Sequence, residues 1–194
     1  MLRTVGATGF LMTTSDEYEA EIKTYTWAKL KKLWQAIKNR DTPGWEPGKA
    51  FEYLILRSFE LDGADIRWPY PVTLASGEEV EQIDGSIRFG SLYALIESKD
   101  EAENIAIAPI AKLRNQLLRR PAGTIGFLFS SRKFTDPAIQ LAYFTLPQAI
   151  LLWTGDEVEY ALQRKKFVEF CEMKYRVCVD TGMPDFSVST GVKS

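Results

Sequence analysis

The chain has 194 residues, 45% of them hydrophobic and 26% charged, which is typical of a globular protein with one substantial core. Its formal net charge of −2 provides no overall attraction for nucleic acid, so any such binding must use local basic clusters. The chain contains no histidine. This excludes Ser-His-Asp and Cys-His hydrolases, histidine-ligated zinc enzymes and nucleases with a histidine base. Hydrolytic chemistry would have to use carboxylates, lysine and a hard cation.

The sequence predicts a cytoplasmic protein without a membrane span. No apolar run approaches the roughly 20 residues that cross a bilayer. Residues 1–14 carry a single Arg and a short apolar patch broken by Gly6 and Gly9, unlike a secretory signal. Cys171 and Cys178, expected in a late helix and a strand, have a spacing that fits neither a disulfide framework nor a zinc knuckle. We therefore expect buried thiols.

The N-terminal region is predicted to form one amphipathic helix over residues 15–40. Thr14 and Glu17 have the spacing of a capping box. Apolar residues then recur at helical spacing, with lysines on the other faces. The apolar residues are Ile22, Trp27, Leu30, Leu33, Trp34 and Ile37, and the lysines are Lys23, Lys29, Lys31, Lys32 and Lys38. Two prolines and two glycines between Asp41 and Gly48 end the helix. We divide the chain into a helical extension, 1–44, and one globular domain, 45–194.

The rest of the chain is expected to mix helices and strands, which indicates an α/β fold built in layers. The helices are expected at residues 49–61, 107–120, 137–144 and 156–174. The strands are expected at residues 66–70, 80–89, 92–98, 124–129 and 149–153. Asp62-Gly63 ends the first of these helices, and Gly90-Ser91 is a two-residue hairpin signal.

Three charged residues share one face of the predicted hairpin. If Gly90-Ser91 is the turn, Phe89 pairs with Leu92, and counting back along both strands places Asp84 directly opposite Glu97. Cross-strand Cβ atoms lie about 5 Å apart. Lys99 shares the face because side chains alternate along a strand. Two carboxylates this close need positive charge between them, so the hairpin is a candidate seat for Mg²⁺ and an activated water.

The alternative for these three residues is a solvated salt-bridge triad on a surface strand pair, which the spacing alone favours. The surrounding sequence argues against it. Residues 93–96 before Glu97 are apolar, and Ile83 and Ile87 line the neighbouring strand. The acids therefore lie where a buried sheet emerges, a common place for catalytic groups in α/β folds.

Four segments, taken in order, point to a known family. They are Gly48-Lys49-Ala50-Phe51-Glu52, Ile83-Asp84-Gly85, Ile96-Glu97-Ser98-Lys99, and Arg119-Arg120-Pro121 followed by the strand Gly126–Ser130. Together they resemble the PD-(D/E)xK nuclease superfamily, in particular its Mrr-like restriction endonuclease branch. The resemblance covers roughly residues 46–131. Ile83 stands where the family name has Pro, and Glu97 where the branch often has Gln.

The resemblance implies a restriction-endonuclease-like fold: a three-layer α/β core with a central mixed sheet flanked by helices, here with an added N-terminal helix. It implies that Asp84, Glu97 and the Ser98 carbonyl hold Mg²⁺ or Mn²⁺, which acts as Lewis acid and template. Lys99 would orient or deprotonate the attacking water and offset charge on the phosphorane. Glu52 would anchor a second metal or position water through the first, although a Glu at the margin of a helix is equally expected to face solvent.

One face of the helix after the hairpin is polar. Lys112, Asn115, Gln116 and Arg119 follow helical spacing opposite the apolar stripe. We expect Lys112, Gln116 and Arg119 to contact the nucleic-acid backbone or to support the active site, while a solvated helix face is an equal alternative. The N-terminal lysines could also follow phosphates. Solubilising charge is the simpler interpretation for them.

The function predicted from these features is that of a Mg²⁺-dependent endonuclease acting on DNA in bacterial defence, restriction or repair. RNA or branched DNA is an alternative substrate, and a homodimer is left open. A noncatalytic nuclease fold that binds nucleic acid or serves assembly is the second hypothesis. The intact Asp84, Glu97 and Lys99 argue against it. A third is a small interaction protein whose helix over residues 15–40 docks a partner.

Overall fold

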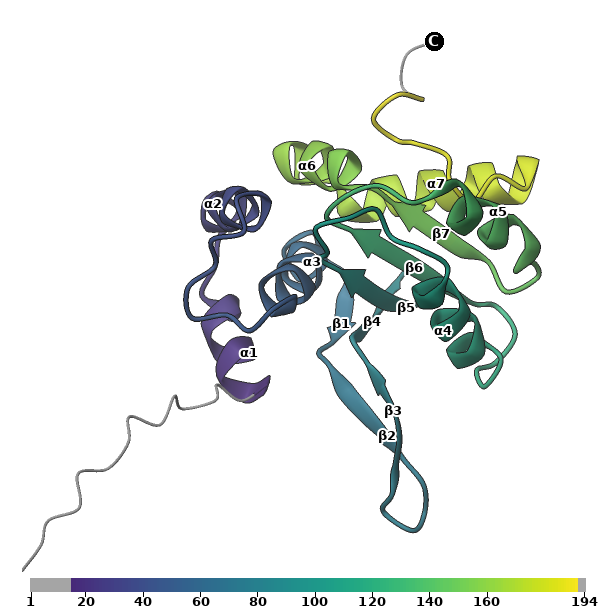
Figure 1. The fold of residues 1–194 in the computed structure, drawn as a ribbon, viewed down its shortest axis with the longest axis horizontal. Helices are drawn as coiled ribbons and strands as arrows, with labels where there is room; N and C mark the ends of the chain where they lie inside the picture. The colour runs from purple at the N-terminus through teal and green to yellow at the C-terminus, as the bar shows by residue number, and fades with distance from the viewer. Residues whose placement is uncertain (1–14, 192–194) are drawn as a thin grey trace, which may run out of the picture.

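The structure is a computed structural model that describes residues 15–191. A five-stranded sheet lies between layers of helices (Figure 1). Its strands, in spatial order, are β1 (Asp65–Arg67), β4 (Gly85–Phe89), β5 (Leu92–Lys99), β6 (Thr124–Ser130) and β7 (Ile150–Trp153). Strands β1, β4 and β5 pair antiparallel, whereas β5, β6 and β7 pair parallel. The predicted three-layer α/β fold with a mixed central sheet is confirmed.

Each face of the sheet carries its own cluster of buried apolar side chains. Helices α3 (Lys49–Leu61), α6 (Gly155–Arg164) and α7 (Phe167–Thr181) contribute to the cluster on one face, and α4 (Ala108–Leu117) and α5 (Asp136–Phe144) to the other. Alternation along β5 sends Ala94 and Ile96 to the α3 face and Leu95 to the α4 face. The same alternation places Glu97 and Lys99 on the α4 face.

Two N-terminal helices, α1 (Ser15–Lys23) and α2 (Trp27–Lys38), replace the single helix predicted over residues 15–40. That prediction is wrong at residues 24–26. The Thr24 hydroxyl donates a hydrogen bond to the Glu21 carbonyl, and Thr26 is extended and precedes α2 as its N-cap. Trp34 of α2 is buried in the same core as α3. Thr14, the expected cap, lies outside the described residues.

The helix predicted over residues 156–174 is also divided in two. Lys165 adopts a left-handed conformation with φ +60°, which ends α6 before α7 begins. Helix α7 extends to Thr181 and contains both Cys171 and Cys178, so the strand expected at Cys178 is wrong. Both cysteines are buried free thiols, as predicted. Within residues 15–191, no helix is both long and apolar enough to cross a bilayer.

The strand predicted over residues 80–89 changes sheets at Asp84. Strand β3 (Glu79–Ile83) pairs with β2 (Tyr70–Thr73) in a two-stranded ribbon that extends away from the main sheet (Figure 1). The polar residues of β3 leave it too few apolar side chains for a place between two helical layers. Asp84 is therefore the single residue between the ribbon and β4.

A buried ion pair fastens the C-terminal segment to α6 and α7. Lys174 Nζ lies 2.6 Å from Glu157 Oε1, and the two side chains are 1% and 2% exposed. Glu157 also accepts hydrogen bonds from the backbone N–H groups of Thr154 and Val188, at 3.0 and 3.1 Å. Lys174 donates to the Phe186 carbonyl. Burial lowers the pKa of Lys174, and the Glu157 carboxylate offsets part of that effect.

Glu157→Ala should lower the free energy of unfolding by about 3–5 kcal/mol, because it leaves the Lys174 ammonium buried without its counter-ion. Urea denaturation measures the change. Glu159→Ala, on the same helix, removes the half-exposed pair with Lys38 and should cost at most ~1 kcal/mol. Equal losses in the two variants would contradict the assignment of the buried pair as the stronger contact.

Candidate active site

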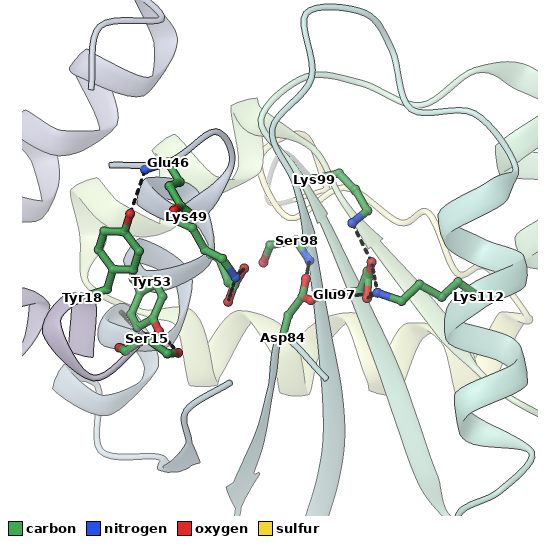
Figure 2. A network of polar contacts seen from close by, with 11 residues as sticks. Ser15, Tyr18, Glu46, Lys49, Tyr53, Asp84, Glu97, Ser98, Lys99 and Lys112 are labelled. Carbon is green, nitrogen blue, oxygen red and sulfur yellow. Dashed lines mark hydrogen bonds and ion pairs between the residues drawn. The ribbon is translucent and has the colours of Figure 1, made fainter. Parts of the chain in front are cut away.

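The turn at Gly90-Ser91 brings Asp84 and Glu97 together. Strands β4 and β5 pair with Phe89 opposite Leu92 and with Gly85 opposite Ile96, which is the predicted register. Gly90 has φ +54°, a conformation that glycine adopts without strain. The next step of this register sets Asp84, directly before β4, opposite Glu97 at the end of β5. The two carboxylates thus lie on adjacent chain segments at one end of the sheet (Figure 2).

Two lysine ammonium groups neutralise Glu97, which is fully buried. Lys112 Nζ lies 2.9 Å from Glu97 Oε1 and 2.8 Å from Oε2, and 4.0 Å from Asp84 Oδ1. Lys99 Nζ lies 2.7 Å from Glu97 Oε1. The predicted neighbourhood of Glu97 and Lys99 is confirmed. The positive charge expected between the carboxylates is also there, but Lys112 of α4 supplies it (Figure 2).

Asp84 is held from its other side by the backbone of β5. The Ser98 N–H donates a hydrogen bond of 2.9 Å to Asp84 Oδ2. Burial, followed by the charge of Glu97, raises the pKa of Asp84, while the Ser98 N–H, Lys112 and Lys99 act in the opposite direction. The ionised form of Asp84 is therefore poorly compensated and would gain from a nearby cation.

Gly85 allows α3 to approach this part of the sheet closely. A Cβ atom at Gly85 would lie 2.6 Å from Leu56 Cδ2 and 3.1 Å from the Arg67 carbonyl oxygen. Both distances are shorter than ordinary van der Waals contact. The residue after Asp84 is thus glycine for a packing reason, and α3 brings its own charged residues next to the carboxylates.

Glu52 of α3 is buried at 7% exposure, so of the two alternatives for this residue the solvent-facing one is wrong. Lys49 Nζ contacts its two oxygens at 3.0 and 2.8 Å. Burial, and then the charge of Asp84, raise the pKa of Glu52 to about 7 despite Lys49. Lys49 was not singled out from the sequence, although its i, i+3 spacing to Glu52 is a usable signal.

Lys99 remains protonated near neutral pH. Burial alone would lower its pKa, but the carboxylates of Glu97, Asp84 and Glu52 more than offset that effect and raise it. The side chain is 28% exposed, so its ammonium lies at the boundary between the buried carboxylates and solvent.

Gln116 of α4 and two arginines that follow the helix contact the ribbon. Gln116 is buried, and its Nε2 donates to the Gln82 carbonyl at 3.2 Å. Arg119 and Arg120 both form ion pairs with Glu81. Of the two uses predicted for this face, the contacts of Gln116 and Arg119 favour support of the site over contact with nucleic acid.

The oxygen atoms of the site are of the kind that a divalent cation binds. Among residues 15–191, no three Asp, Glu, His or Cys side chains form a group that could hold a metal. Mg²⁺, however, is often bound by one or two carboxylates and keeps several waters. Asp84 and Glu97 provide two such carboxylates, and both are buried. The residues present therefore fit Mg²⁺ or Mn²⁺.

A central mixed sheet with an Asp and a Glu-x-Lys tripeptide on adjacent segments defines the class of restriction-endonuclease-like proteins. Residues 46–162 match the restriction endonuclease family Mrr_cat, so the chain belongs to that family. This confirms the family resemblance noted in the sequence. Among curated proteins, none is significantly similar to the chain.

The solved structures that are similar to the chain include two restriction endonucleases. One is the DNA modification-dependent restriction endonuclease AspBHI, at 16% identity and a TM-score of 0.46, with coverage of 82% of this chain and 40% of that one. The other is the MspJI restriction endonuclease in complex with a 27-mer oligonucleotide, at 20% identity and a TM-score of 0.38, with coverage of 86% and 36%. The chain therefore spans less than half the length of either protein.

The raised pKa of Glu52 makes stability depend on pH. Between about pH 4.5 and 7 the folded state keeps a proton that the unfolded state has lost. The free energy of unfolding should therefore fall as pH rises through this window. Glu52→Gln should flatten that slope and leave the remaining part due to Asp84. Urea denaturation in EDTA at several pH values measures it.

Glu60→Gln is the matched control, because Glu60 lies on the same helix and pairs with Arg57. This variant should keep the wild-type slope. An unchanged slope in Glu52→Gln would show that Glu52 is ionised across the whole range.

Proposed function

We propose that this chain is the catalytic domain of a divalent-metal-dependent endonuclease that hydrolyses phosphodiester bonds in DNA. The observation that carries the proposal is the convergence of buried Asp84 and Glu97, with Lys99 2.7 Å from Glu97, in a member of the restriction endonuclease family. We place this activity in the cytoplasm. A role in bacterial defence, restriction or repair is part of the same proposal and rests on the family.

Asp84, Glu97 and the Ser98 carbonyl would hold Mg²⁺ or Mn²⁺. When bound, such a cation supplies Lewis acidity at a phosphate oxygen and a lowered pKa for water. Burial, and then the charge of Glu97, raises the pKa of Asp84, so its ionised form lacks compensating charge. Positive charge bound beside Asp84, where the scissile phosphate would lie, would therefore stabilise the site.

Lys99 would orient the attacking water and stabilise the negative charge that develops on the phosphorane. Its raised pKa favours these roles over removal of a proton from the water. Glu52 is better suited to exchange a proton near neutral pH, because its pKa is about 7. Lys49 would hold the Glu52 carboxylate in place. Glu52 would thereby position a water or a second metal ion.

Lys112 remains our candidate for a contact with the DNA backbone, since its side chain is 43% exposed at the edge of the site. Gln116 and Arg119 would act through the ribbon that they contact, and a direct contact of either with DNA stays a prediction. A homodimer also stays a prediction.

The nuclease domain is proposed to comprise residues 45–194, with residues 1–44 as a helical extension. The start of the family match at residue 46 supports this boundary. Buried side chains of α1 and α2 nevertheless belong to the same hydrophobic core as those of α3. The extension would therefore be docked onto the domain and contribute to its stability.

A noncatalytic nuclease fold is the second candidate. The lack of a three-ligand acidic cluster among residues 15–191 favours it. Calorimetric titration with Mn²⁺ distinguishes the two, because a noncatalytic fold has no need to bind the ion, whereas the proposed nuclease must do so through Asp84 and Glu97.

Asp84→Asn and Lys99→Met should each reduce DNA cleavage by roughly 100-fold or more, because Asp84 would hold the metal ion and Lys99 would stabilise the charge that develops on the phosphate. Conversion of supercoiled plasmid to nicked and linear forms, with Mg²⁺ or Mn²⁺ against EDTA, measures the loss. Glu103→Gln and Lys133→Met change exposed residues of the same charges outside the site and should cleave normally. Cleavage that survives in both site variants would overturn the assignment.

A further inference from the structure

We propose that Lys112 is a built-in counter-cation: its ammonium occupies the position of a divalent cation between Asp84 and Glu97, and must leave when the metal binds. This inference rests on the proposed function, since it concerns the same two carboxylates. It assigns Lys112 a role in setting the metal affinity of the protein, beyond its predicted contact with nucleic acid.

The contacts of Lys112 are those expected of a cation shared by two ligands. Its Nζ lies within 2.9 Å of both Glu97 oxygens and 4.0 Å from Asp84 Oδ1. Lys99, by contrast, forms an ion pair with a single Glu97 oxygen, at 2.7 Å. A metal ligated by Asp84 and Glu97 needs the oxygen atoms that Lys112 now contacts. Glu97 Oε1 already contacts both lysines, so a divalent cation would add a third positively charged group to this carboxylate and would repel the Lys112 ammonium strongly where solvent screening is weak.

The side chain of Lys112 can leave without a change in the fold. It reaches the site from α4 and is 43% exposed, whereas the Glu97 side chain is fully buried. A lysine is a compact charge on a flexible four-carbon chain, so its head group can move into solvent. Helix α4 itself is fixed one turn later, where Gln116 bonds to the backbone of β3. The exchange therefore involves one side chain.

This arrangement balances charge in both states of the site. Without metal, Lys112 adds a second positive charge to that of Lys99 beside the two buried carboxylates, whose burial without enough compensating charge would be costly. With metal, Lys112 becomes a free ammonium beside the site, available to a phosphate oxygen. The consequence is a weaker affinity for the cation, because each binding event must displace Lys112.

Lys112→Met should tighten Mn²⁺ binding by about tenfold or more, because the methionine keeps the apolar chain and removes the competing charge. Isothermal titration calorimetry with MnCl₂ measures the dissociation constant directly and without DNA. Lys112→Arg keeps the charge and should stay near the wild-type value. Arg114→Met removes a positive charge from an exposed position on the same helix, and should change the dissociation constant by no more than about twofold.

Thermal unfolding provides a second readout. In EDTA, Lys112→Met should melt below the wild type, because its carboxylates have lost a counter-ion. Addition of Mn²⁺ should then raise its melting temperature by more than it raises that of the wild type, since tighter binding stabilises the folded state further. Arg114→Met should show the wild-type response to the ion.

The possible results separate this inference from the proposed function. Mn²⁺ binding that is unchanged or weakened in Lys112→Met, with the wild type binding through Asp84, overturns the competition and leaves the nuclease assignment intact. Wild-type protein that binds no Mn²⁺ overturns both. Tighter binding in Lys112→Met and in Arg114→Met alike would reveal a general effect of net charge and would also overturn the role of Lys112.

Discussion

The structure of this site depends on the mutual repulsion of two carboxylates that the fold holds in a buried position. Asp84 and Glu97 face each other because a two-residue turn leaves the β4–β5 hairpin no other register. The neighbouring positively charged and N–H groups all reduce this repulsion. The Ser98 N–H holds Asp84, while Lys99 and Lys112 neutralise Glu97. The ionised form of Asp84 remains the less well compensated of the two carboxylates, and a bound cation would stabilise it.

The fold produces this arrangement with few specialised residues. A glycine at position 85 allows α3 to pack next to the start of β4, which brings Glu52 and Lys49 beside Asp84. The parallel crossover from β5 to β6 carries α4 over the opposite face, so that Lys112 reaches Glu97. The charged groups therefore approach from both layers of helices and meet where β5 ends.

Local signals in the sequence predicted much of the fold and of the candidate site. The bounds of α3, the turn and register of the hairpin, and the pairing of Glu97 with Lys99 all depend on residues close together in the chain. The predictions failed where tertiary packing decides: helix breaks at residues 24–26 and Lys165 follow from how α2 and α7 turn back onto the core. The burial of Glu52 and the place of Lys112 depend on helix positions that periodicity cannot specify.

The position of Asp84 between two sheets has a mechanical consequence. Strand β3 ends at Ile83 and β4 begins at Gly85, so a twist of the projecting ribbon is transmitted to Asp84 through one peptide unit on each side. Asp84 is thus the connection between the ribbon and the main sheet. Glu81 of β3 forms ion pairs with Arg119 and Arg120, which directly follow α4, and these contacts restrain the ribbon. The strength of these ion pairs limits how far a movement of the ribbon can displace Asp84 from Glu97.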